Sequence, residues 1–324
     1  MKQNILVVGG CGYIGTHMVK ALLEAGHQPI TLDNLSKGHR ELLPGGDFIQ
    51  GDIQDSGLLD QVFSTHAIDA VMHFAALIEV GESVQRPLAY YRNNVSATAN
   101  LLEAMVRHDV RRFIFSSSAA VYGEPEYTPI DEHHSLRPTS PYGETKLYVE
   151  NILRACDRAY GLKSVCLRYF NAAGADPSGA IGERHDPESH LIPLIMQVAL
   201  GQRDSIAIYG TDYPTPDGTC VRDYIHVNDL AAAHLLAIEA LAQGGARRVY
   251  NLGNGSGFSV RQVIETVRKI TGHPIPAEET PRRPGDPAVL IASSDNIIKD
   301  LNWQPRFDDL EEIVRTAWNW HRRS

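Results

Sequence analysis

The sequence predicts an α/β fold, a doubly wound parallel sheet followed by a smaller C-terminal α/β lobe. Short apolar runs alternate with longer helical stretches over the first 170 residues. This alternation is typical of parallel strands joined by crossover helices. Glycine or polar residues follow these strands directly, at the positions where such sheets bind ligands. After about residue 171, prolines and glycines become frequent and apolar segments shorten, which indicates the second lobe.

Length and charge limit the class of protein. A chain of 324 residues buries a large core and suits one large or two medium domains. The formal net charge of −9 argues against general binding of nucleic acid, although a few arginines can still hold a phosphorylated small molecule. No apolar run reaches the length of a membrane span. The four cysteines form no CxxC pair and are too sparse for a disulfide framework, so we expect a cytoplasmic protein. The charge and the apolar runs lead us to expect no nucleic-acid or membrane partner.

Six apolar runs are expected to form the strands of the sheet. The expected strands are residues 4–8, 29–32, 48–50, 70–74, 112–115 and 164–168. The helices expected between them are 16–25, 94–108 and 142–160. The strand ends carry the glycine turn 9–15, Asp33, Asp52, Phe74-Ala75, Ser116–Ser118 and Asn171. We therefore expect one ligand site along this edge of the sheet.

The second lobe is expected to hold helices at residues 190–201, 227–242 and 260–272 and another at the C-terminus. We place the first domain at residues 1–170 and the second at 171–324. The segment at about 222–252 is a candidate to return to the first domain.

Three glycines predict a dinucleotide site. Gly9, Gly12 and Gly15 follow the first strand and precede a helix. Without Cβ atoms they let the backbone turn tightly and approach a pyrophosphate at the helix N-terminus. The spacing alone is also compatible with a glycine-rich turn that binds nothing.

Two aspartates strengthen the dinucleotide interpretation. Asp33 ends the second strand, where a carboxylate can accept both ribose hydroxyl hydrogens and would repel a 2′-phosphate, favouring NAD over NADP. Asp52 could pair with the adenine amino group. A turn or cap role remains open for Asp33, and a helix-cap role for Asp52.

Ser118, Tyr142 and Lys146 predict proton transfer. Tyr142 and Lys146 are four residues apart and share one face of a helix that starts near Ser140. A free phenol with a pKa of about 10 is a poor base at neutral pH. The Lys146 charge, an oxidised nicotinamide and the helix N-terminus could lower that pKa. The Ser118 hydroxyl could bridge a substrate alcohol and the phenolate.

These residues resemble the extended short-chain dehydrogenase/reductase family, and more narrowly its UDP-hexose 4-epimerases, over essentially the whole chain. The first half matches in the glycine turn, Asp33–Leu35, Gly51–Ile53, His73–Ala75, Gly81–Ser83, Asn93–Val95, Ser116–Gly123, Ser140–Gly143, Lys146 and Arg168–Asn171. The second half matches in Asp212–Thr215, Val221–Val227 and Arg282–Asp286. The motifs of the second half are more diagnostic, since the whole superfamily shares the glycine turn.

The resemblance implies a tightly held NAD that interconverts UDP-galactose and UDP-glucose. Tyr142 would take the sugar 4-hydroxyl proton while a hydride leaves C4, and the 4-keto sugar would turn over before the hydride returns. By the same likeness NAD would also contact Tyr13, Ile14, Asn34, Ile53, Phe74, Ala75, Asn93, Ser116 and Tyr169. The resemblance further implies a homodimer.

The substrate contacts that the resemblance implies lie mostly in the second lobe. Arg222 and Arg283 suit a diphosphate, because guanidinium and phosphate form bidentate pairs. The other implied contacts are Ser118, Tyr142, Asn171, His190, Leu191, Tyr209 at the uracil, Asp286 at the ribose and Leu290. A salt bridge remains an alternative role for either arginine.

Three positions depart from the family pattern. Ile78 replaces a lysine that touches the cofactor ribose in some members, and His190 replaces an asparagine near the diphosphate. Leu290 is smaller than the tyrosine of some members, which suggests that N-acetylated hexoses also fit.

Other functions remain as alternatives. A 4,6-dehydratase would need an acid just after Ser118, where Ala119, Ala120 and Val121 stand. A uronate or pentose 4-epimerase, or a non-catalytic NAD or nucleotide-sugar sensor, would share most of the motifs. We expect no metal site, because the histidines form no HxxxH or HExxH group. The helix at 94–108 could face a dimer partner or pack within the fold.

Overall fold

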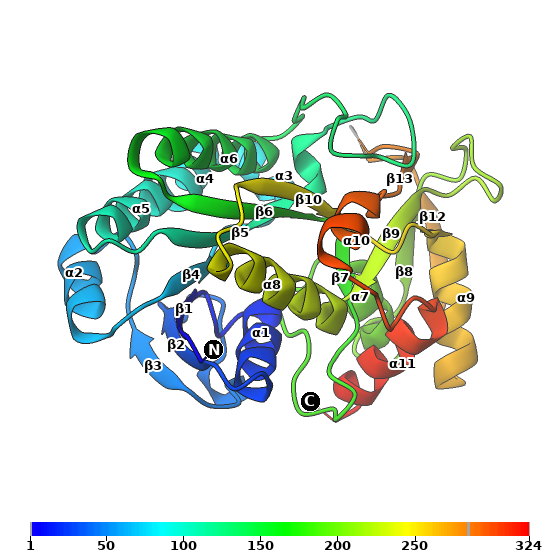
Figure 1. Ribbon diagram of the computed structural model, residues 1–324. Helices are drawn as coiled ribbons and strands as arrows, with labels where there is room; N and C mark the ends of the chain where they lie inside the picture. The colour runs from blue at the N-terminus through cyan, green and yellow to red at the C-terminus, as the bar shows by residue number, and fades with distance from the viewer. Residues whose placement is uncertain (1, 284–285, 324) are drawn as a thin grey trace. The chain divides into compact units, whose positions relative to one another are not determined.

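Seven strands form the main sheet of the computed structural model, which describes residues 2–283 and 286–323 (Figure 1). Their order is β10-β6-β5-β4-β1-β2-β3, and each pair from β3 to β5 is parallel. The strands are β1 Asn4–Val8, β2 Gln28–Asp33, β3 Asp47–Gln50, β4 Ala70–His73, β5 Arg112–Ser118, β6 Lys163–Tyr169 and β10 Arg248–Leu252. The order reverses between β1 and β4, so the predicted doubly wound, Rossmann-type sheet is confirmed.

One strand is longer than the sequence predicts. β5 continues through Ser116, Ser117 and Ser118, which were expected to follow it. The reason is that Ser117 points into the protein, where its hydroxyl donates to the Glu150 carboxylate at 2.6 Å. A bonded serine can be buried in a strand at little cost.

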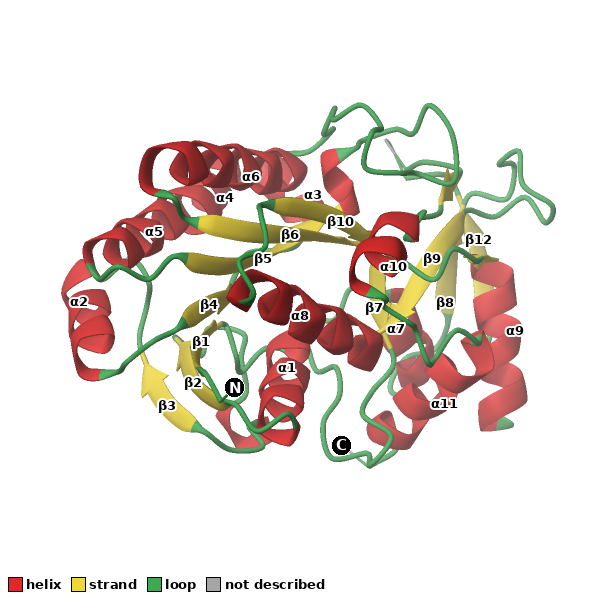
Figure 2. Cartoon of the chain, in the orientation of Figure 1, coloured by secondary structure: helices red, strands yellow, loops and turns green. Residues whose placement is uncertain are grey.

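Helices cover both faces of this sheet (Figures 1 and 2). α2 Ser56–Thr65, α5 Ala97–Arg107 and α6 Pro141–Tyr160 bury Leu59, Leu101 and Leu153 in one apolar core. α1 Tyr13–Glu24 and α8 Val227–Ala242 lie on the other face. The shorter helices are η1 Arg40–Leu42, α3 Val80–Gln85, α4 Pro87–Tyr90, the π-helical η2 Tyr91–Ser96 and η3 Ala119–Val121.

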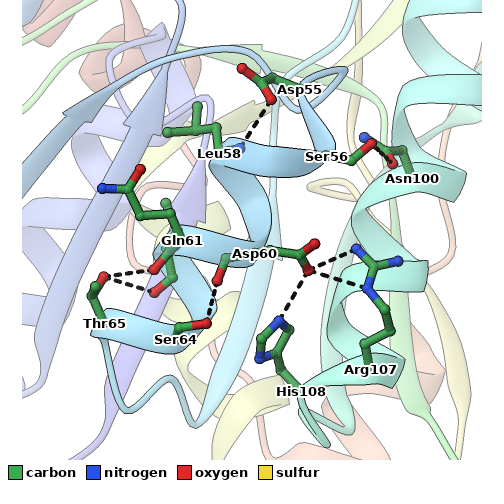
Figure 3. A network of polar contacts seen from close by, with 11 residues as sticks. Asp55, Ser56, Leu58, Asp60, Gln61, Ser64, Thr65, Asn100, Arg107 and His108 are labelled. Carbon is green, nitrogen blue, oxygen red and sulfur yellow. Dashed lines mark hydrogen bonds and ion pairs between the residues drawn. The ribbon is translucent and has the colours of Figure 1, made fainter.

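Polar contacts also join α2 to α5 (Figure 3). Asp60 accepts a hydrogen bond from Arg107 at 2.9 Å, and His108 Nε2 lies 3.1 Å from the same carboxylate oxygen. The Asp55 carboxylate caps α2 by accepting from the Leu58 amide at 3.0 Å. Asp52 therefore does not have the helix-cap role that its sequence position left open.

A second sheet and its helices form the other part of the chain. β7 Asn171–Ala173, β9 Val221–His226, β11 Gly257–Ser259 and β13 Val289–Leu290 make a four-stranded sheet, and β8 Ile206–Tyr209 pairs with β12 Ala277–Thr280. The helices are α7 Leu191–Ala199, α9 Val260–Thr271, α10 Asp295–Leu301 and α11 Leu310–His321. α7, α9 and α11 confirm the helices predicted here, as α8 does for 227–242, whereas α10 was not predicted. Ile195, Val263 and Ile313 share one buried core.

By internal contacts the chain divides into two compact units. The first comprises Met1–Gly123, Ser135–Arg168 and Ala231–Tyr250, and the second comprises Glu124–His134, Tyr169–Leu230 and Asn251–Ser324. The predicted division into a cofactor domain and a substrate lobe stays a prediction. None of the described helices is long and apolar enough to cross a bilayer.

A buried ion pair ties α6 to β5 and β6. Arg168 donates to Glu150 through Nε at 2.9 Å and Nη2 at 2.6 Å, and through Nη1 to the Tyr122 hydroxyl at 2.9 Å. Ser117 completes the carboxylate's shell. Both charged side chains are at least 95% buried. A buried charge is tolerated only when it is paired and hydrogen-bonded, as it is here.

His73 is held neutral at the end of β4. Its Nε2 lies 2.9 Å from the Thr98 hydroxyl, which itself donates to the Asn94 carbonyl at 2.8 Å. The hydroxyl proton is thereby used, so Nε2 of His73 is the donor. Burial, and secondarily the Lys146 charge, lower the pKa of His73 to about 3.

We expect Arg168→Met to destabilise the protein by about 3–5 kcal/mol, because it leaves the Glu150 carboxylate buried without its partner. Denaturant unfolding measures the loss. Arg158→Met, at an exposed arginine on α6, is the matched control and should change stability by less than about 0.5 kcal/mol. Equal effects of the two substitutions would contradict the role given to the pair.

Acid should destabilise the protein partly through His73. An unfolded histidine titrates near 6.5, whereas the pKa of folded His73 is about 3. The unfolded state therefore binds the extra proton in this window, and stability falls as the pH drops from about 6.5 toward 3. His73→Gln lacks this contribution. The gap in unfolding free energy between the variant and the unmodified protein should therefore shrink as the pH drops from about 6.5 toward 3. The exposed His133→Gln should leave the pH dependence unchanged; a gap for His73→Gln that does not vary with pH would exclude this assignment.

Candidate active site

In the turn after β1, Gly9 and Gly15 have no room for a side chain. Gly9 has a φ of +79°, and a Cβ there would lie 2.5 Å from the Ala75 amide nitrogen. A Cβ on Gly15 would lie 2.2 Å from the Gly9 carbonyl oxygen. Both distances are far below van der Waals contact, and the atoms met are backbone atoms that cannot easily move away. The turn therefore brings the β1 and β4 strand ends together, as close approach to a pyrophosphate would require.

Helix α1 begins in this turn without a side-chain cap. Gly12 is the N-cap, and Tyr13 and Ile14 are the first two helical residues. Among the described residues no side chain caps this end, and no acidic residue lies in the first turn. An uncapped helix N-terminus is a good site for a phosphate, so the turn fits the pyrophosphate of a dinucleotide.

Asp33 ends β2 and is 8% exposed. Its Oδ2 accepts from the Cys11 amide at 2.9 Å and its Oδ1 from the Leu35 amide at 2.8 Å. Asp33 therefore does have the turn role that its sequence position left open. Each carboxylate oxygen has a second lone-pair direction, so both can still accept a ribose hydroxyl. Burial, with the charge of Asp33 as a smaller cause, raises the pKa of Cys11 to about 12.

Asp52 is joined to Asn34 beside Asp33. The Asn34 amide donates to Asp52 Oδ2 at 2.8 Å, and the Gln54 amide donates to Oδ1 at 2.8 Å. The next residue, Ile53, is buried, and its carbonyl accepts from Asn100 at 2.6 Å. This arrangement leaves Asp52 partly exposed at the strand end, where an adenine amino group could be its partner.

The segment after β4 is held by Asn94, which sequence reasoning missed. Phe74 and Ala75 donate their amides to the Val8 carbonyl at 2.8 and 3.2 Å. Asn94 is buried, accepts from the Leu77 amide at 2.9 Å and donates to the Leu77 carbonyl at 2.9 Å. Its neighbour Asn93, the predicted cofactor contact, donates to Asn94 at 2.9 Å. The π-helical turn at residues 91–96, which carries both asparagines, could not be anticipated from helical periodicity.

Ser116, Ser118, Tyr142 and Lys146 come together in the first unit. α6 begins as predicted, with the Ser140 side chain accepting from the Gly143 amide at 3.2 Å and Pro141 in the first turn. Lys146 is 3% exposed, and its Nζ donates to the Ser116 carbonyl at 2.8 Å. The Ser118 hydroxyl accepts from the Ala120 amide at 3.1 Å and interacts with the Tyr142 phenol. The strand end and the helix thus present one hydroxyl, one phenol and one amine together.

The pKa values of this group depend mainly on burial. Burial raises the pKa of Tyr142, and the hydrogen bond from Ser118 only partly opposes this. Burial lowers the pKa of Lys146 to about 7. The Lys146 nitrogen lies 5.8 Å from the centre of the Tyr142 ring. In the chain alone the net shift of the phenol pKa is therefore opposite to the one expected from sequence.

Four substrate candidates of the second unit form one connected group. The Arg283 guanidinium lies 3.8 Å from the centre of the Tyr209 ring. The Asp286 amide donates to the Arg283 carbonyl at 3.3 Å, and Asp286 forms an ion pair with Arg222. Leu290 is opposite Arg222 in the pairing of β13 with β9. The salt bridge kept as an alternative for Arg222 is thus present; Pro284 and Gly285 of the same motif lie outside the described residues.

Strand β9 organises this group. Arg222 is partly exposed, whereas the next residue, Asp223, is fully buried and accepts amide hydrogen bonds from Asn254, Gly255 and Ala292 at 2.6, 3.0 and 3.0 Å. Burial raises the pKa of Asp223 to about 6. Asn171 donates to the Asp223 carbonyl at 3.0 Å. Tyr169 is buried at the end of β6.

His190 and Leu191 lie at the start of α7. His190 is the N-cap residue, and its Nδ1 bonds the buried Glu183 carboxylate. Burial opposes a charge on His190, but the Glu183 charge outweighs it and raises the pKa of the imidazole. A family asparagine at this place would carry no such charge.

Comparison with known proteins identifies the family of this chain. A family model described as "NAD dependent epimerase/dehydratase family" matches residues 5–253. A UDP-glucose 4-epimerase of Halalkalibacterium halodurans is 59% identical over 98% of this chain and 95% of its own, and one of Lacticaseibacillus casei is 52% identical over 98% and 97%.

Solved structures agree as well. A UDP-glucose 4-epimerase from Brucella ovis in complex with NAD has a TM-score of 0.96 and 48% identity over 98% of this chain and 97% of its own. One from Bifidobacterium longum with NAD⁺ and UDP has a TM-score of 0.94 and 40% identity over 99% and 98%. The predicted resemblance is confirmed, and the chain belongs to the NAD dependent epimerase/dehydratase family.

Proposed function

We propose that this protein uses bound NAD to interconvert UDP-galactose and UDP-glucose by reversible hydride transfer at sugar C4. Its relatives named UDP-glucose 4-epimerase, at 52–59% identity over almost the full chain, support the reaction class. The observation that carries the proposal is that the Tyr142 phenol interacts with Ser118 and has the buried Lys146 nitrogen 5.8 Å from its ring centre. Binding of a ligand alone would not require such a group.

In this proposal Tyr142 accepts the proton of the sugar 4-hydroxyl, and Ser118 orients that hydroxyl through its own. Bound NAD would accept and return the C4 hydride and bring the positive charge of its oxidised ring to the site. Lys146, fixed by the Ser116 carbonyl, supports the phenolate from the neighbouring helical turn. Since burial raises the phenol pKa in the chain alone, Tyr142 becomes a base only when positive charge enters its surroundings.

The connected group of the second unit would bind the nucleotide. Tyr209, stacked by Arg283, offers a flat face for uracil, and the two arginines offer donors to the diphosphate. Asp286 would exchange or share its bond with Arg222 when it holds the ribose. Asn171, His190 and Leu191 complete the proposed substrate contacts.

A dehydratase is less well supported. The positions after Ser118 form the short helix η3 and are Ala119, Ala120 and Val121, none of which can donate or accept a proton. Elimination of water across C5 and C6 would need an acid there. An assay of turnover together with bound NAD distinguishes the enzyme from a non-catalytic sensor.

Tyr142→Phe should lower the conversion of UDP-galactose to UDP-glucose by about 10²–10⁴-fold, because it removes the general base. Bound NAD, released by denaturation and quantified, should remain. Tyr148→Phe, at an exposed tyrosine of the same helix, is the matched control and should retain activity. Undiminished turnover in Tyr142→Phe would reject the mechanism, and an unmodified protein that binds NAD without turnover would favour the sensor.

We further propose that UDP-N-acetylhexosamines are accepted, because Leu290, which pairs with Arg222, is smaller than the tyrosine of some family members. Leu290→Tyr should lower turnover of UDP-N-acetylglucosamine at least about tenfold relative to UDP-galactose. Leu290→Met, of similar volume, should leave the ratio unchanged. Absence of N-acetylglucosamine epimerisation by the unmodified protein at saturating substrate would refute this extension.

We also propose a cytoplasmic homodimer. The four cysteines are free thiols, as a reducing compartment would keep them. Helices α3 and α4, which pack on α6, expose Val80, Val84 and Leu88 at 50–76%, and Tyr148 of α6 is 48% exposed. An apolar patch of this kind suits a second copy. Sedimentation should show twice the 35.7 kDa chain mass, and Leu88→Glu should lower it; a monomeric unmodified protein would refute the dimer.

A further inference from the structure

Four side chains that precede α7 converge on one point. Glu183, His185, Glu188 and His190, here called the acid–histidine cluster, lie within eight residues in an E-x-H-x-x-E-x-H spacing. One donor atom from each, a carboxylate oxygen or an imidazole nitrogen, lies within 4.8 Å of all the others. The sequence predicts no metal site, because this spacing matches neither HxxxH nor HExxH.

The separations of these atoms suit a small four-coordinate ion. His185 Nδ1 lies 3.2 Å from Glu183 Oε1, and Glu188 Oε1 lies 3.7 Å from the Nδ1 atoms of both histidines. His190 Nδ1 also contacts Glu183 Oε1. With zinc–ligand distances of about 2.0–2.1 Å, the donors of a tetrahedral site are about 3.3 Å apart. The separations of 3.2 and 3.7 Å lie close to this value.

The cluster is also held in place by hydrogen bonds to groups other than the four side chains. The side chains of Glu183 and Glu188 are 3% and 4% exposed. The Glu183 backbone carbonyl accepts from the Trp320 indole at 2.8 Å. Glu188 Oε1 accepts from the amides of Ser189 and His190 at 2.8 and 2.9 Å. Bonds of this kind fix the orientation of ligands before an ion arrives.

Charge sets what can occupy the centre. Two buried carboxylates carry a charge of −2, which must be compensated nearby. Protons on both imidazoles can supply it, and so can one divalent cation bound by two neutral imidazoles. Two nitrogen and two oxygen donors in a four-coordinate set suit Zn²⁺, whereas Mg²⁺ and Ca²⁺ prefer six or more oxygens.

We propose that the acid–histidine cluster binds one zinc ion through Glu183, His185, Glu188 and His190. All four ligands come from the protein, so the site is structural. It fixes the loop of residues 183–190 onto the start of α7. Nδ1 of His190 binds the ion, and Nε2 stays available for another partner. His190 is also a proposed substrate contact, but none of the readouts of this site requires turnover, so the two proposals can fail separately.

The full-length protein, stripped with a chelator and dialysed, should rebind one equivalent of zinc after gel filtration, measured by elemental mass spectrometry. Cobalt in place of zinc should give the strong visible absorption of a four-coordinate site. Zinc should also raise the midpoint of thermal unfolding, since it binds the folded state. A chain that retains no zinc and gives six-coordinate cobalt absorption would overturn the proposal without any variant.

His185→Asn and Glu188→Gln should each weaken zinc binding at least about tenfold in competition with a chromophoric chelator, because each removes one ligand. His133→Asn, at an exposed histidine outside the cluster, is the matched control. Circular dichroism identifies a variant that has lost its fold. If one variant does not fold, zinc binding by the other variant tests the proposal. If both fold and bind zinc as His133→Asn does, the carboxylates hold only protonated imidazoles and the site is refuted.

Discussion

The buried pair of Arg168 and Glu150 fixes the frame of the proposed catalytic group. It joins the middle of α6 to β6, and through Ser117 it also holds the end of β5. Tyr142 and Lys146 lie on that helix, and Ser116 and Ser118 flank Ser117 on that strand. The positions of these four residues relative to one another therefore depend on two charges kept out of water. Such a pair adds little net stability compared with an apolar one, but it is costly to break.

Much of the first unit could be predicted from local patterns. The glycine turn, Asp33, the Ser140-Pro141 helix start and the Tyr142–Lys146 spacing are all local signals, and six strands follow from apolar runs. The Asn94 contacts could not be predicted, because the bond from Asn94 to Leu77 spans 17 residues and Asn93 offers the same amide. The helix-cap role left open for Asp52 belongs to Asp55, three residues later, and the sequence could not decide because both are good cap residues.

Distance along the chain explains the rest of what was missed. Arg222 and Asp286 are 64 residues apart, and nothing in either motif shows that each is the other's partner. The phenol pKa of Tyr142 depends on burial, which a four-residue spacing does not reveal. The acid–histidine cluster is compact in sequence, yet only the fold brings its four donor atoms to one centre.

Tyr142, Lys146 and Glu150 repeat every four residues along α6, whereas a helical turn takes 3.6. Each step therefore rotates the side chain by about 40° around the helix axis. Because of this rotation, the Tyr142 phenol is partly buried, the Lys146 amine is buried, and the Glu150 carboxylate lies inside the core. A fourth member at the same spacing would turn away from the strand end altogether. Proton chemistry is thus confined to the first two turns of the helix, and the third turn can serve only as its anchor.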